Sequence, residues 1–382
     1  MRSGTGEILM QLRDGGAMSR ADLARITGLS SASVTKLTAR MVQSGLIEDL
    51  SGPHSQTMGR PPVRVALRND ACAAVAVHMG AGKVNLALSD LGLGLTEMQS
   101  FEFDLDTPVD DVIQRTIGLV RRAVLASGLP MSKLVGVGIG LPGGVDGAKR
   151  GSTSSVISGW NDIAFADAFE EALGLPATVE HNATAMAMAE AIYTRTGPTD
   201  SILYVLVDKG TGGGFAQPGS GGRRGPVELG HLAVEPGGPR CICGGEGCLE
   251  VFFSERGLKA LAPAGATTPA DMFAAAMASA EWPKIYEYIL QAFSTSITLL
   301  APQRIILGGL LTEAPDAFVA ALEADLPHRV MPHLRRNLQI GKPGLSEPVG
   351  VKGAASIAFE KFFYEQGPVA ALAKPARNKR RA

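Results

Sequence analysis

The chain has 382 residues, of which 45% are hydrophobic, and a formal net charge of −1. This length suggests two or three domains, and this hydrophobic content is enough to fill ordinary cores. The sequence has no apolar run of about eighteen residues, and its first 16 residues lack an apolar secretory core. We therefore expect a cytoplasmic protein without a membrane segment.

The charge is unevenly distributed along the chain. Residues 1–70, which we call the head, contain nine Lys or Arg and six Asp or Glu. Residues 71–373, the body, contain 22 basic and 31 acidic residues, and residues 374–382 contain five basic residues and no acid. A basic head on an acidic body favours a head that binds a polyanion. The basic tail, 369–382, is interpreted as a solvated end.

Three helices are predicted in the head. Residues 5–13 place apolar side chains on one helical face. Ser19 is expected to cap a second helix, which buries Leu23 and Ile26, and Ser30 is expected to cap a third. Two helices joined by a short turn with a glycine form the arrangement of DNA-reading modules, so the head is predicted to be a winged helix-turn-helix domain.

The outward face of the third helix is predicted to contact DNA. It presents short hydroxyls and one cation near the helix start: Ser31, Ser33, Thr35 and Lys36. Such groups can hydrogen-bond to base edges and phosphates in a major groove. Two predicted strands with a polar loop follow as a wing, from which Arg60, stiffened by two prolines, is predicted to enter a minor groove. The alternative for the head is a three-helix module that binds protein.

The body begins with a predicted β-hairpin and continues with further strands and helices. The expected strands are 71–79, 84–89, 135–141, 202–207 and 304–307, and the expected helices are 110–127 and a segment rich in Ala and Met that ends near 194. Glycine turns join several of these elements. Each glycine taken singly is explained by ordinary turn chemistry.

Three of the four cysteines lie within eight positions of one another. These are Cys241, Cys243 and Cys248, and His231 lies just upstream. One imidazole and three thiolates complete a tetrahedral set for a structural Zn²⁺ ion, and the glycines among them allow tight turns. Scarce thiols clustered with a histidine are typical of metal sites. A redox pair is disfavoured because Cys241 and Cys243 lack the Cys-x-x-Cys spacing.

The same region reads Glu228-Leu229-Gly230-His231, nine further residues, and then Cys241-Ile242-Cys243-Gly244-Gly245-Glu246-Gly247-Cys248-Leu249-Glu250. This pattern resembles the signature of the ROK family, which groups sugar-responsive repressors with sugar kinases. The resemblance implies an α/β body with a two-lobed actin/hexokinase-like, ribonuclease H-like fold. It implies lobe 1 at 71–184, joined by a C-terminal helix near 353–368, and lobe 2 with the zinc site at 185–352.

The resemblance also implies a sugar pocket. In the family, the glutamates that match Glu228 and Glu250 and the histidine that matches His231 contact sugar hydroxyls, a role that suits carboxylates. One ring nitrogen of His231 can hold zinc while the other binds a hydroxyl. The turn 142–146 resembles the family turn beside the sugar, which places Gly144 in the pocket. Salt bridging or helix capping is the alternative role for the two glutamates.

Four positions differ from the kinase members of the family. The aspartate that supports magnesium–phosphate chemistry there is His78 here, and the phosphate-gripping threonine is Gly82. The general base, an aspartate, is Asn182, which follows His181 in place of an asparagine. An amide can hold a hydroxyl but cannot accept its proton, so Asn182 and His181 are predicted as sugar contacts. The run 208–214 matches the kinase loop that wraps nucleotide phosphates.

The sequence therefore predicts a sugar-responsive transcriptional repressor of the ROK type that has lost its kinase chemistry. Its expected partners are operator DNA, a sugar effector, and further copies of itself in a homodimer or homotetramer. The alternative is an ATP-dependent sugar kinase that carries a DNA-binding head. Phosphoryl transfer needs an anchored metal and a base, and losing the base alone lowers the rate by a factor of about 10² to 10⁴. A protein partner or a phosphorylated sugar as the effector remains open.

Overall fold

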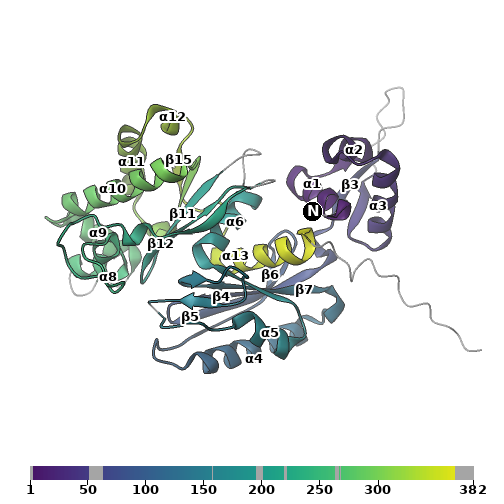
Figure 1. Cartoon of the computed structure of the whole chain (residues 1–382), viewed down its shortest axis with the longest axis horizontal. Coiled ribbons are helices and arrows are strands. Elements are labelled where there is room, and N and C mark those ends of the chain that lie inside the picture. The colour runs from purple at the N-terminus through teal and green to yellow at the C-terminus, as the bar shows by residue number, and fades with distance from the viewer. Residues whose placement is uncertain are drawn as a thin grey trace, which may run out of the picture.

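The structure is a computed structural model, and it describes residues 3–50, 63–156, 158–194, 201–218, 222–262, 266 and 268–365. A small N-terminal head lies beside a larger body of two lobes (Figure 1). Within the described ranges, no helix is both long enough and apolar enough to cross a lipid bilayer.

The head combines three helices with a small sheet. Its elements are α1 (Gly4–Gly15), β1 (Met18–Ser19), α2 (Arg20–Thr27), α3 (Ser31–Gln43), β2 (Ile47–Leu50) and β3 (Arg64–Leu67). Ser19 and Ser30 cap α2 and α3 as predicted, because their hydroxyls accept hydrogen bonds of 3.1 and 3.2 Å from backbone nitrogens three residues further on. The antiparallel pair β2–β3 supplies the two strands of a wing, and β1 adds a third strand to the sheet.

One prediction for the head is wrong. The helical spacing predicts that Ile26 is buried, but its side chain is 44% exposed. The inner face of α2 runs through Leu23, Ala24 and Thr27 instead, so Ile26 is rotated onto the outer side of the helix. The predicted minor-groove residue Arg60, the rest of the wing loop and the basic tail 369–382 lie outside the described residues.

Lobe 1 is built on a five-stranded sheet with the order β10-β7-β4-β5-β6. The strands are β4 (Ala73–Gly80), β5 (Lys83–Asp90), β6 (Leu95–Glu102), β7 (Leu134–Leu141) and β10 (Ala177–His181), with α4 (Val109–Ser127) and α5 (Phe165–Leu173) packed against the sheet. Strands β4, β7 and β10 are parallel, and β5 and β6 are antiparallel to their neighbours. Strand β6, whose alternate residues face solvent, is not among the predicted strands.

Lobe 2 repeats this topology with the order β13-β12-β11-β14-β15. Its strands are β11 (Ile202–Val207), β12 (Thr211–Ala216), β13 (Arg224–Val227), β14 (Arg304–Gly309) and β15 (Gln339–Gly341). Its helices are α7 (Leu249–Phe252), α8 (Glu255–Leu261), α9 (Pro269–Ala278), α10 (Trp282–Leu300), α11 (Asp316–Asp325) and α12 (Pro332–Arg335). In each sheet the central strand, β4 or β11, pairs with the next strand of the chain in an antiparallel hairpin. On its other side it pairs with a parallel strand.

Short elements complete the body. These are β8 (Gly144–Val145), β9 (Ser152–Ser154), η1 (Asn69–Ala71), η2 (Met131–Lys133), η3 (Leu229–His231), η4 (Leu310–Glu313) and η5 (Leu326–Arg329). Two long helical segments lie between the sheets: α6 (Asn182–Tyr193) and α13 (Val349–Ala358), the latter continued by the π-helical turn η6 (Phe359–Glu365). The C-terminal helix therefore begins four residues before the predicted position 353, immediately after its N-cap residue Pro348.

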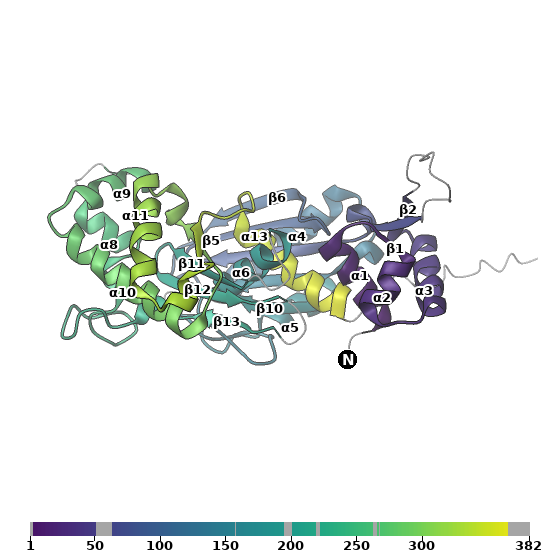
Figure 2. The ribbon, with the colours of Figure 1, turned by 90° about the horizontal axis from the view of Figure 1, so that it is seen from above.

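The segment α13–η6 joins the body to the head. It runs from the region between the lobes to the side of α1 (Figures 1 and 2). One continuous apolar core contains Ile8 and Leu9 of α1 together with Phe363 of η6. A Cβ atom on Gly6 of α1 would lie 2.2 Å from the carbonyl oxygen of Tyr364, so the backbones of the two segments are in direct contact at this glycine.

Candidate metal centre and ligand cavity

The structure brings one histidine and three cysteines to a single point in lobe 2. The ligand atoms of His231, Cys241, Cys243 and Cys248 all lie within 4.8 Å of one another. Cys241 Sγ is 3.7 Å from His231 Nδ1, and Cys243 Sγ is 3.7 Å from Cys248 Sγ. One imidazole nitrogen and three sulfurs at this spacing form a donor set that can enclose a tetrahedral ion.

Glycine makes the tight path of this loop possible. Gly247 has φ +65°, and a Cβ atom there would lie only 1.7 Å from the carbonyl oxygen of Glu235. The backbone N–H of Cys241 donates to the carbonyl of Gly245 at 2.8 Å, which closes the turn between the sulfurs. The backbone conformation by itself therefore presents the thiols to one another.

The surroundings of the thiols oppose negative charge without a cation. Burial raises the pKa of Cys241, and it raises the pKa of Cys248 to about 12. The backbone N–H of Gly245 hydrogen-bonds to Cys243 Sγ at 3.5 Å and lowers the pKa of that more exposed thiol. A divalent cation is the kind of ion that can balance the charge of three close thiolates.

A cavity of about 310 Å³ lies beside the cluster and is lined by residues of both lobes. Its lining contains all six predicted sugar contacts: Gly144, His181, Asn182, Glu228, His231 and Glu250. Ser154 and Ser155 also line it, although no pattern in the sequence indicates them. Single hydroxyls beside a short hairpin give no such signal, and only the pairing of Ser154 with Gly144 brings this segment to the cavity.

Glu250 connects the cluster to the cavity. Its carboxylate accepts the backbone N–H of Thr211 at 2.9 Å, and Cys241 Sγ lies 3.9 Å from its other oxygen. The residue is buried at the start of α7, whereas Glu228 is exposed at the cavity edge. One oxygen of Glu250 therefore holds the start of β12, and Glu228 has the greater freedom to meet a ligand.

The other side of the cavity is formed by neutral polar groups. Asn182 begins α6, and its amide nitrogen donates to the carbonyl of Met79 at 2.9 Å. Burial lowers the pKa of His78 to about 4. Burial, assisted by the nearby charge of Lys149, lowers the pKa of His181 to about 4 as well. Both imidazoles are therefore uncharged near pH 7.

These two histidines predict a loss of stability in mild acid. Between pH 6.5 and pH 4, the unfolded chain protonates them while the folded chain keeps them neutral, so the free energy of unfolding falls as pH falls. Above pH 6.5 both states are neutral and the contribution vanishes. Replacing His181 with Gln is expected to remove on the order of 1 to 3 kcal/mol of this decline, measured by urea unfolding from pH 7 to 4.5. An equal decline in the wild type and the variant would contradict the assignment.

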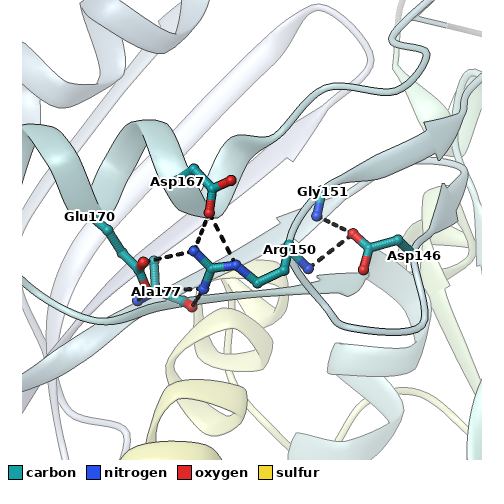
Figure 3. Close-up of polar contacts among 6 residues, drawn as sticks. All are labelled: Asp146, Arg150, Gly151, Asp167, Glu170 and Ala177. Carbon is teal, nitrogen blue, oxygen red and sulfur yellow. Dashed lines mark hydrogen bonds and ion pairs between the residues drawn. The ribbon is translucent and has the colours of Figure 1, made fainter.

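The turn that carries Gly144 is held by an ionic network (Figure 3). Asp146 accepts the backbone N–H groups of Arg150, at 3.0 Å, and of Gly151. The guanidinium of Arg150 pairs with Asp167 and Glu170 of α5, which connects the turn to the outer helix of lobe 1. This network fixes the position of the cavity wall relative to the sheet.

Residues 74–361 match the ROK family. This chain belongs to the ROK family. Residues 4–55, which cover α1 to β2, match the MarR family. The family assignment agrees with the lobed fold and with the cysteine motif that suggested it.

Two curated ROK relatives span nearly the whole chain. The DNA-binding transcriptional repressor Mlc of Escherichia coli (strain K12) is 25% identical over 366 residues, which cover 90% of this chain and 89% of that protein. The xylose repressor of Bacillus subtilis (strain 168) is 23% identical over 370 residues, covering 93% and 94%. Head and body therefore occur together in proteins that are described as repressors.

Solved structures show the same ROK architecture. A ROK family transcriptional regulator, described as a homologue of E. coli Mlc, superimposes with a TM-score of 0.77 at 23% identity and covers 96% of this chain and 98% of its own. The ROK hexokinase from Thermus thermophilus gives a TM-score of 0.61 at 25% identity and covers 76% of this chain and 98% of its own. The fold is thus shared with a regulator over 96% of the chain and with a kinase over the body.

The glycine run of this ROK body serves two purposes, because residues 208–212 line the cavity and the glycines that follow are closely packed. The sequence predicts a phosphate loop at 208–214, but Thr211–Ala216 form strand β12. A Cβ atom on Gly214 would lie 2.2 Å from the carbonyl oxygen of Ala183, so glycine is needed for the close contact with α6. Lys209 Nζ lies 2.7 Å from the point where a Cβ atom on Gly82 would be, so this amine fills the space at the position of the kinase threonine.

The four predicted DNA contacts on α3 are all exposed: Ser31, Ser33, Thr35 and Lys36. Two of the hydroxyls already have partners within the helix. Thr35 Oγ1 donates to the carbonyl of Ser31 at 2.8 Å, and Ser33 Oγ lies 2.9 Å from the capping hydroxyl of Ser30. The long cationic side chain of Lys36 is the member of the set with the greatest reach.

Proposed function

We propose that this ROK protein is a sugar-responsive, DNA-binding transcriptional repressor whose kinase chemistry is lost. One observation carries the proposal: a MarR-like head is packed on a ROK body in which Asn182 and His78 stand where kinases have carboxylates. The domain division that goes with it is a head at 1–70, lobe 1 at 71–184 with the C-terminal helix, and lobe 2 at 185–352. The repressors that share both parts support this function.

The effector is proposed to be a sugar bound in the 310 Å³ cavity. Carboxylates, serine hydroxyls and neutral imidazoles match the way proteins hold polyols. From lobe 2, Glu228 is the proposed acceptor of a sugar hydroxyl's hydrogen bond, and the second ring nitrogen of His231, which carries the proton when the first holds the metal, is the proposed donor to a hydroxyl. Asn182 and His181, with the backbone around Gly144, are the proposed contacts from the opposite side. A sugar that touches both lobes favours the closed arrangement of the cleft.

The four-ligand cluster is proposed to hold a structural Zn²⁺. The donor set fits, because Zn²⁺ prefers three thiolates and one imidazole in a closed tetrahedral site. When bound, the ion fixes the tautomer and direction of an imidazole ligand. For this chain, that means that His231 presents its outer nitrogen to the cavity and that the loop holding Glu250 keeps its shape.

The partner of the head is proposed to be operator DNA in the cytoplasm. Two chains in a homodimer or homotetramer would present two α3 helices to a symmetric site, since paired heads read paired half-sites. Sugar binding would change their separation, and a coupling of about 1 to 3 kcal/mol is typical of such regulators. The basic charge of the head supports contact with phosphates.

Operator binding in the presence of sugars tests this function. We expect xylose, glucose or N-acetylglucosamine to weaken binding to upstream DNA of the protein's own operon by about 5- to 150-fold. Lys36→Gln is expected to weaken binding without sugar and to reduce its salt dependence by about one phosphate contact. Lys259→Gln, at an exposed position on α8 in lobe 2, is the matched control, with no change expected. Operator affinity that stays the same with each of the three sugars would contradict the proposal.

The kinase alternative is tested by turnover. With ATP, Mg²⁺ and the same sugars, we expect no ADP above the background of protein-free buffer, because the base and the metal-anchoring carboxylate are both replaced. The Asn182→Asp variant restores only one of the two groups, so it is expected to remain inactive. Steady ADP production by the wild type would favour the kinase instead.

A further inference from the structure

Two polar atoms in the lining of the cavity lack a hydrogen-bond partner among the described residues. They are Asn182 Oδ1 and His78 Nε2, and both are shielded from solvent. The two side chains lie close together, since a Cβ atom on Gly140 would be 2.6 Å from Asn182 Oδ1 and 3.7 Å from His78 Cδ2. Buried polar groups are ordinarily satisfied, so this pair indicates a ligand contact.

The chemistry of the two atoms specifies one kind of group. The orientation of Asn182 is set because its amide nitrogen donates to the carbonyl of Met79, which leaves Oδ1 as an acceptor. The neutral imidazole of His78 can donate a hydrogen bond through Nε2. A hydroxyl has the chemistry to satisfy both atoms, since it can donate to Oδ1 and accept from Nε2–H. A phosphate ester at the same place has no proton for Oδ1 at neutral pH.

His78 also touches the C-terminal helix. A Cβ atom on Gly350, in the first turn of α13, would lie 2.6 to 2.8 Å from three atoms of the His78 ring. The imidazole therefore rests directly on the helix backbone while it also lines the cavity. A small rotation of this ring moves it against α13.

The far end of the same helical segment, η6, packs against the head. Along its path, a Cβ atom on Gly138 of β7 would lie 1.9 Å from the carbonyl oxygen of Ala354, so α13 lies directly on the sheet. In η6, Glu360 forms a buried ion pair with Arg13 of α1. The Arg13 guanidinium lies 4.5 Å from the ring centre of Tyr364 (the η6 end is seen beside α1 in Figure 2). The segment is thus tightly packed from the cavity to the head.

We infer that His78 is the effector-sensing residue of this chain. It receives a free hydroxyl of the sugar together with Asn182, and through Gly350 it transmits the occupied state to α13 and the head. This inference rests on the proposed function and deepens it, because it selects a sugar whose hydroxyl at this point is free over the ester phosphorylated at that hydroxyl.

Three variants of the full-length chain test the inference. His78→Phe keeps a ring on Gly350 but removes the nitrogen, so the affinity for the active sugar is expected to fall about 5- to 10-fold. Gly350→Ala displaces the ring, so the sugar is expected to change operator affinity by less than about twofold. Gly118→Ala, in α4 with open space around it, is the matched glycine-to-alanine control and is expected to behave as the wild type.

Sugar binding by calorimetry and operator binding are measured separately, with glucose, N-acetylglucosamine, their 6-phosphates and xylose. Circular dichroism confirms that each variant is folded. A normal response in both His78→Phe and Gly350→Ala would overturn the inference alone, as would a 6-phosphate that acts more strongly than its free sugar. A wild type that responds to none of these compounds would overturn the proposed function and the inference with it.

Discussion

Replacing Cys241 with serine is expected to abolish metal binding and to destabilise lobe 2. Cys241 Sγ lies 3.7 Å from His231 Nδ1 and 3.9 Å from Glu250, so its loss opens the cluster and the cavity wall together. Structural zinc contributes about 10 to 16 kcal/mol to the folding of small zinc peptides. We expect loss of the ion to remove a part of such a contribution from this loop. We expect zinc content to fall from about one per chain to near zero and the melting temperature to fall by several degrees.

Cys72 provides the control for this prediction. It is buried in the apolar core between the head and lobe 1, and burial raises the pKa of its thiol to about 12, so it is an inert apolar side chain. Cys72→Ala is expected to keep the full zinc content, measured by elemental analysis of dialysed protein. Retention of one zinc per chain by Cys241→Ser would show that the ligand set is wrong.

Glu360→Gln is expected to destabilise the junction between head and body by about 3 kcal/mol. Among the described residues, the variant leaves the buried Arg13 guanidinium with Asp14 as its ion-pair partner, and removing one of the two carboxylates that balance a buried cation is costly. The side chains of Arg13 and Glu360 are 8% and 10% exposed, so solvent cannot replace the lost partner. The effect is measured as the change in the free energy of unfolding of the transition that includes the head.

The ion pair of Glu287 and Arg329 provides the control, because the same Glu-to-Gln substitution can be made there in an exposed pair. Its side chains are 53% and 37% exposed, so Glu287→Gln is expected to cost less than about 1 kcal/mol. Adding Arg13→Met to Glu360→Gln removes the cation that has lost one of its two carboxylates, but it also takes that cation from Asp14, so it is expected to recover only part of the lost stability. Equal losses in the two single variants would show that the buried pair has no special role.

Several features are predictable because they depend on local chemistry. The caps at Ser19 and Ser30 involve backbone groups three residues away, so neighbouring sequence is sufficient to define them. The metal cluster spans fewer than twenty residues, and a histidine with three thiols in a glycine-rich loop can converge without help from distant segments. The long family motif in the same stretch is the reason that the two-lobed fold is predictable from the amino-acid order.

Other features depend on contacts between distant segments. The exposure of Ile26 cannot be inferred from helical spacing, because the neighbours of α2 determine which of its faces is inner. The glycines at 212–214 suggest a loop, and only the approach of α6 to Gly214 shows that they serve a strand. The same limitation applies to Lys209, whose contact with Gly82 crosses between two hairpins.

Amino-acid order alone is therefore enough to define many of the local elements, the capped helices and the convergence of the thiols, since each depends on residues that are close in the chain. Long-range packing is what places His78 on Gly350 and pairs Arg13 with Glu360, a partner 347 positions away. Such contacts leave no local pattern, because either partner would suit many environments. They exist only because the two sheets, α13 and the head pack into one arrangement, and that packing links the cavity to the head.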